Sequence, residues 1–138
     1  MLTTTIYVTD ADKERLQKRM DEYRQSNPNC ADSVRALERE LKRAHIVTAA
    51  DIPASVVTMN SRAVLRNRQS GRETVYTLVY PEDASLASGK VSVLAPVGLA
   101  ILGYGKGDVI SWPVPSGVAE LEVVDVVYQP EAVGDFHL

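Results

Sequence analysis

Apolar side chains near the start of the chain recur at helical spacing. Leu16, Met20 and Tyr23 stand at positions i, i+4 and i+7, which predicts an amphipathic helix over "TDADKERLQKRMDEYRQ", residues 9–25. The stretch "RQSNPNC" then breaks the pattern, because Pro28 disfavours helical geometry at the residue before it and asparagine favours turns.

A second apolar stripe follows this turn. Its members recur in steps of three, four and three residues: Val34, Leu37, Leu41 and Ala44. This is the rhythm of a coiled-coil seam, and it predicts a helix over "ADSVRALERELKRAHIV", residues 31–47. Two such helices joined by a short turn form an antiparallel hairpin, which we expect to project by roughly 22 Å at ~1.5 Å per residue.

The first turn of the first helix carries polar residues that suit a helix N-terminus. Thr9 can cap it through its hydroxyl group. Asp10 and Asp12 place negative charge where the helix dipole favours it. We therefore expect the helix to begin at these residues.

The second half of the chain has the composition of strands. "VVTMNSRAVLRN" (56–67) and "ETVYTLVY" (73–80) are rich in β-branched and aromatic residues and predict two strands. The intervening "NRQSGR", centred on Gly71, suits a hairpin turn. "GKVSVLAP" (89–96) predicts a third strand.

One short helix interrupts these strands. Pro96 opens "PVGLAILG" and Gly103 closes it, in agreement with the preference for proline at the start and glycine at the end of helices. Two further strands are predicted over 108–115 and 118–130, and Pro113 favours an edge position for the first of them.

We therefore expect an α+β fold with two parts. Residues 1–47 form a short antiparallel coiled-coil hairpin. Residues 48–138 form a small, mostly antiparallel sheet folded around one short helix.

The composition is that of an ordinary globular protein, with 138 residues, 45% hydrophobic and 24% charged. A net charge of −3 gives no general attraction to nucleic acid. The lone cysteine, Cys30, excludes an internal disulfide and favours a reducing compartment. We see neither a signal-peptide pattern nor the ~20-residue apolar run of a membrane span, and expect a soluble cytoplasmic protein.

The second half resembles the Gre transcript-cleavage factors. Their C-terminal domain, related in fold to FK506-binding proteins, has a strand ending in Ser/Ala-Pro, a helix ending in "ALLG", a "GD" loop and a "PxG" turn. The matching positions are Ala95–Pro96, Ala100–Gly103, Gly107–Asp108 and Pro115–Gly117. With "VVTMNSRAVLRN", "TLVYP" and the tail "YQPEAVGDFHL", the chain resembles shortened members of this family from end to end.

The resemblance implies a specific chemistry at the hairpin tip. In Gre factors the coiled coil enters the secondary channel of RNA polymerase, and the acidic tip, Asp-x-x-Glu-Asn, helps to hold a catalytic Mg²⁺. The tip here contains Asn29, Cys30 and Asp32, but Arg35 stands where the second carboxylate is needed. The arm is also shorter, so we expect polymerase binding without efficient transcript cleavage.

The resemblance also implies a partner, the RNA polymerase core near the entrance of its secondary channel. Docking would use the segment from Pro96 to Asp108, with Tyr104, Lys106, Asp108 and Ser116 as candidate contacts. Asp108 is equally suited to forming a Gly-Asp turn. We expect a monomeric, non-enzymatic regulator that obstructs Gre factors and contacts nucleic acid only indirectly or weakly.

The sequence offers little for catalysis or metal binding. Cys30 has no nearby histidine to activate it, and His45 and His137 lie far apart, so we expect no metal and no cofactor. Two alternatives stay open: a cleavage factor acting through Asp32, and a prolyl isomerase. The second is disfavoured because isomerase sites are rich in aromatic residues, which are scarce in this chain.

Overall fold

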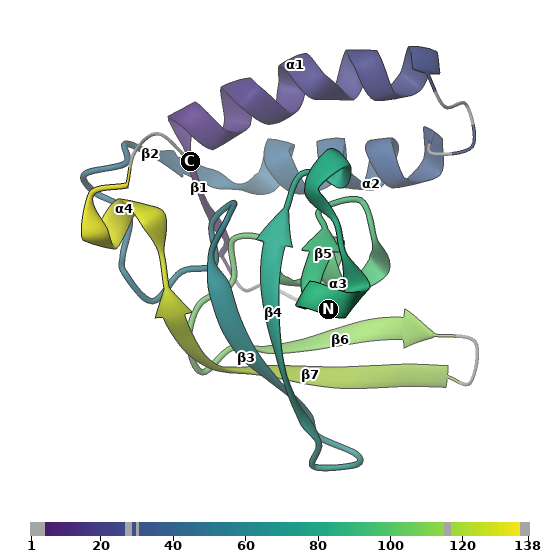
Figure 1. The fold of residues 1–138 in the computed structure, drawn as a ribbon, viewed down its shortest axis with the longest axis vertical. Helices are drawn as coiled ribbons and strands as arrows, with labels where there is room; N and C mark the ends of the chain where they lie inside the picture. Colours follow the sequence, from purple (N-terminus) through teal and green to yellow (C-terminus); the bar gives the residue numbers. More distant parts are fainter. Residues whose placement is uncertain (1–4, 27–28, 30, 115–116, 136–138) are drawn as a thin grey trace.

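The computed structural model describes residues 5–26, 29, 31–114 and 117–135, and it has the predicted order of two helices followed by a sheet domain (Figure 1). The helices are α1 (Asp10–Ser26), α2 (Ala31–Arg43), α3 (Pro96–Ile101) and α4 (Pro130–Val133), with 3₁₀ turns η2 (Pro81–Asp83) and η3 (Leu86–Ser88). The strands are β1 (Tyr7–Thr9), β2 (His45–Val47), β3 (Arg62–Asn67), β4 (Glu73–Val79), β5 (Lys90–Ser92), β6 (Val109–Val114) and β7 (Gly117–Tyr128).

The helical hairpin packs through the two predicted apolar stripes. Leu16 and Met20 of α1 are buried, as are Val34, Leu37 and Leu41 of α2. Figure 1 shows the helices side by side across one end of the sheet domain, with α2 between α1 and the sheet domain. The same cluster of buried side chains continues into the sheet and α3, so the hairpin and the sheet domain share one hydrophobic core.

The prediction that the second helix runs to residue 47 is wrong. The helix ends at Arg43, and residues 45–47 form β2, which pairs in parallel with β1 in the register Tyr7↔His45. The backbone amide of His45 donates a hydrogen bond to the carbonyl of Ile6 at 2.8 Å. The β-branched residues after the helix suit this extended backbone. The hairpin is therefore closed at its base by two strands.

The main sheet has the strand order β5-β4-β3-β7-β6. All neighbours are antiparallel except β4 and β5, which are parallel. The β3–β4 turn contains Gly71 with a φ of 74°, as its predicted turn position requires. Pro113 lies in β6, an edge strand, which confirms its predicted position.

The predicted strand over 56–67 is wrong in its first half. The backbone amide of Ser61 donates to the carbonyl of Thr58 at 3.0 Å, and Asn60 has a left-handed φ of 67°, so this segment turns sharply before β3 begins. Val57 and Met59 are buried within the turn, which explains an apolar content like that of a strand.

Helix α3 begins at Pro96, as predicted, and the chain leaves it through Gly103 with a φ of 85°. Gly98 allows a close approach to the preceding segment, because a Cβ there would lie 2.0 Å from the carbonyl oxygen of Ser92. This contact fixes α3 against the end of β5.

Polar side chains at the start of α1 and farther along it are engaged within the fold. Thr9 caps α1 as predicted, since its hydroxyl accepts a hydrogen bond from the amide of Asp12 at 3.0 Å. The Asp12 side chain is not a surface charge in the first turn but is buried. Farther along α1, Arg19 and Tyr23 donate hydrogen bonds to Glu82 of η2 at 3.1 and 2.9 Å.

Candidate functional site

The hairpin tip contains an exposed acidic residue that is paired with an arginine. Asp32 is exposed in the first turn of α2, and its carboxylate forms an ion pair with Arg35 one turn along. Asn29 is exposed as well, and Cys30 lies outside the described residues. Arg35 lies where the resemblance to Gre factors led us to expect a second carboxylate, and it pairs with Asp32.

A second ion-pair group holds the outer part of the hairpin together. Arg24 of α1 pairs with Asp21 at 3.0 Å and with Glu38 of α2. The hydrogen bond from Arg24 lowers the pKa of the Glu38 carboxyl. This group joins the two helices rather than offering a paired carboxylate for a metal.

Tyr104, a predicted docking contact, is buried in the structure rather than exposed. Its side chain is only 2% exposed. Its hydroxyl accepts a hydrogen bond from Nη2 of Arg43 at 2.8 Å, and burial raises the pKa of the phenol. Tyr104 therefore connects the end of α2 to the loop after α3.

The other predicted contact residues lie in different settings. Asp108 accepts a hydrogen bond from the amide of Gly105 at 2.8 Å and so closes the loop as a turn residue. Lys106 is exposed, with its Nζ 3.8 Å from an Asp125 carboxylate oxygen. Ser116 lies outside the described residues.

A groove that the sequence did not indicate lies beside the β3–β4 hairpin. Its buried and half-buried apolar lining comes from four elements: Leu65 of β3, Tyr76 of β4, Val97 of α3 and Leu121 of β7. The more exposed part of its lining includes Ser70, Arg72 and Thr74. The groove is therefore an apolar surface with a polar rim that includes a cation.

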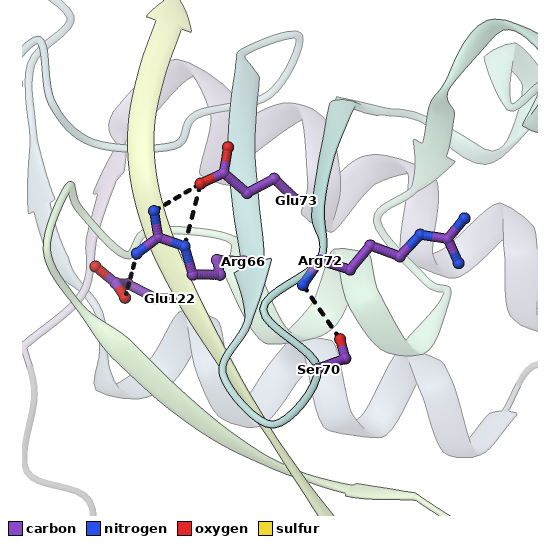
Figure 2. Close-up of polar contacts among 5 residues, drawn as sticks. All are labelled: Arg66, Ser70, Arg72, Glu73 and Glu122. Atoms are coloured by element: carbon purple, nitrogen blue, oxygen red, sulfur yellow. Dashed lines mark hydrogen bonds and ion pairs between the residues drawn. The ribbon is translucent and has the colours of Figure 1, made fainter.

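Figure 2 shows that the two arginines of this hairpin extend to opposite sides. Arg66 of β3 donates to Glu73 from Nε and Nη2, at 3.1 and 2.6 Å, and its Nη1 lies 3.5 Å from Glu122 of β7. The backbone amide of Arg72 donates to the Ser70 hydroxyl at 3.2 Å, while its guanidinium extends away from the hairpin. Within the described ranges the Arg72 guanidinium has no hydrogen-bond or ion-pair partner.

Two further properties bear on function. Across the described residues, we find no group of three or more histidine, cysteine, aspartate or glutamate side chains placed to hold a metal ion. None of the helices in the described part of the chain is long and apolar enough to cross a bilayer.

Comparisons with known proteins identify the family. Residues 52–128 match the family model "Transcription elongation factor, GreA/GreB, C-term", and residues 4–47 match "Rnk N-terminus". The chain belongs to the GreA/GreB family of transcription elongation factors. The chain is also similar to the "Regulator of nucleoside diphosphate kinase" (Rnk) of Escherichia coli K12. The two sequences are 43% identical over 139 residues, which cover 100% of both chains.

Other relatives agree with this assignment. The transcription elongation factor GreA of Syntrophomonas wolfei is 36% identical over 91 residues, which cover 66% of this chain and 57% of GreA. The solved structure of the prokaryotic transcription elongation factor GreA/GreB from Nitrosomonas europaea matches with a TM-score of 0.72 and 41% identity, covering 91% of this chain and 100% of that one. These matches confirm the resemblance inferred from the sequence.

Proposed function

We propose that this chain binds RNA polymerase near its secondary channel and obstructs Gre factors there, without promoting efficient transcript cleavage. The observation that carries the proposal is the ion pair between Asp32 and Arg35 at the hairpin tip. Holding a catalytic Mg²⁺ requires two or more free oxygen ligands close together. A carboxylate that is paired with a guanidinium is a poor ligand for this purpose, and the described residues form no group of three or more acidic, histidine or cysteine side chains that could hold the ion.

The limited reach of the hairpin supports the same proposal. The 17 residues of α1 span about 25 Å. Arg19 and Tyr23 contact Glu82, so much of this length lies beside the sheet domain rather than beyond it. Only the last part of the hairpin extends past these contacts, which is less than the projection expected from the sequence.

We assign docking to the sheet domain, which carries the GreA/GreB match. Lys106 remains a candidate contact because it is exposed. The relative in E. coli is named as a regulator of nucleoside diphosphate kinase. We infer that any effect of this chain on that kinase follows indirectly, from altered transcription.

The test is a competition on core RNA polymerase. Labelled GreA is bound to the polymerase and the full-length chain is titrated in, and transcript cleavage is followed in parallel in a stalled, backtracked complex. We expect displacement of GreA without faster cleavage. Cleavage as fast as with GreA contradicts the proposal, and so does failure to bind polymerase. The full chain is used because deleting the hairpin would expose the core that it shares with the sheet.

A further inference from the structure

The β3–β4 hairpin uses its two arginines in opposite ways. The charge of Arg66 is balanced by Glu73 and Glu122 on one side of the hairpin. Arg72 extends to the other side and lines the groove, with no partner for its guanidinium among the described residues. An arginine held at the rim of an apolar surface can form charge-assisted hydrogen bonds to a carboxylate.

The rest of the groove lining indicates which kinds of side chain a bound partner would carry beside its carboxylate. Leu65, Tyr76, Val97 and Leu121 contribute apolar surface from four different elements. Glu73 also lines the groove, but its carboxylate is engaged by Arg66. The groove therefore presents apolar surface and one available positive charge, which complements a segment with apolar side chains and an acidic residue at one end.

We propose that this groove receives a segment of RNA polymerase with an apolar ridge and a carboxylate that pairs with Arg72. The proposal rests on the proposed function and moves the main docking contact from the predicted Pro96–Asp108 segment towards the β3–β4 hairpin. Figure 1 shows the turn of this hairpin extending beyond the rest of the sheet, where a large partner can reach it.

A second copy of this chain is a less suitable occupant. A two-fold symmetric contact through the groove places the same surface on both sides of the interface. Two Arg72 side chains would then approach one another without an available acidic partner in the groove lining. Charge complementarity favours an acidic partner over self-association.

The experiment compares the affinity of full-length variants for core RNA polymerase by fluorescence anisotropy. Arg72→Gln removes the charge at the groove, and Thr74→Glu adds a carboxylate to the exposed part of its lining. Arg68→Gln is the matched control, since Arg68 is exposed in the same turn but does not line the groove. All three positions are exposed, so each variant is expected to fold.

We expect Arg72→Gln and Thr74→Glu each to weaken binding by about fivefold, and Arg68→Gln to change it by less than about twofold. The wild-type affinity is expected to fall with added salt, and that of Arg72→Gln to fall less. Equal affinities for Arg72→Gln and Arg68→Gln, with wild type bound, overturn the groove assignment alone. Absence of wild-type binding removes the proposed function and this inference together. A wild-type dimer whose dissociation constant is changed in sedimentation by Arg72→Gln, but not by Arg68→Gln, overturns the choice of partner.

Discussion

The carboxylate of Asp12 accepts a hydrogen bond from the backbone amide of Met59 at 3.1 Å, across 47 residues of sequence. The contact joins the first turn of α1 to the buried turn before β3. Thr58 in the same turn donates a hydrogen bond to Glu131 at 2.7 Å, so α4 meets the same point. Burial, with a contribution from Glu131, raises the pKa of Asp12 to about 6 despite the Met59 hydrogen bond.

The first prediction concerns the pH dependence of stability. The folded-state pKa of Asp12 lies above its ordinary value of 3.8, so the folded protein binds this proton more tightly than the unfolded chain. Its stabilising contribution is full below about pH 4 and is lost as the pH rises through about 6, an effect of about 3 kcal/mol. Asp12→Asn should remove this component. Urea unfolding at pH 4, 6 and 8 measures it, and Asp10→Asn, at an exposed neighbour, should retain the wild-type slope.

The second prediction concerns Tyr104. Tyr104→Phe removes the hydrogen bond from Arg43 and should lower the free energy of unfolding by about 1–2 kcal/mol, because the donor is charged. Affinity for polymerase should stay at the wild-type value. Lys106→Gln in the same loop provides the comparison, since its exposed ion pair contributes little to stability. A loss of polymerase affinity in a fully folded Tyr104→Phe variant would restore Tyr104 as a docking residue.

The third prediction separates tip chemistry from reach. Arg35→Glu removes the partner of Asp32 and supplies a second acid one turn away on α2. We expect no efficient cleavage from this variant in a backtracked complex, because the hairpin remains short. Cleavage at a rate close to that of GreA would show that tip charge, rather than reach, limits the wild-type chain. Arg39→Glu, which leaves the Asp32–Arg35 pair intact, controls for the change in net charge.

The fourth prediction concerns the approach of α3 to β5. Gly98→Ala places a methyl group against the backbone of Ser92 and should destabilise the fold by about 1–3 kcal/mol or more, since backbone must move. Gly98 has no left-handed φ, so the effect is steric. Gly134→Ala is the contrast, because its Cβ meets open space and only its φ of 80° opposes the change. Thermal unfolding of the two variants distinguishes these causes, and equal midpoints would contradict the steric explanation.

Much of the fold was predictable because its signals are local. The stripes through Leu16 and Leu37, the turn at Gly71 and the proline at the start of α3 each depend on neighbours in sequence. The end of α2 was not predictable in this way. Three-residue strands such as β1 and β2 are too short to show a period, and their pairing joins Tyr7 to His45.

The candidate site was harder to predict for a related reason. The groove draws its lining from β3, β4, α3 and β7, and only their arrangement in space makes one surface of them. The burial of Tyr104 was not predictable because a tyrosine between glycines resembles an exposed loop residue in sequence. Its partner, Arg43, lies 61 residues earlier. The mismatch at Arg35, in contrast, was visible directly in the sequence.

The parallel pairing of β1 with β2 also bears on how the length of the helical arm can change. Both ends of the helical arm are fixed at the register Tyr7↔His45, so the arm is an insertion between two strands whose positions do not depend on its length. Equal additions to α1 and α2 at the tip would lengthen the arm by whole turns and leave the sheet domain in place. Arm length can therefore evolve, or be engineered, independently of the surface that selects the partner.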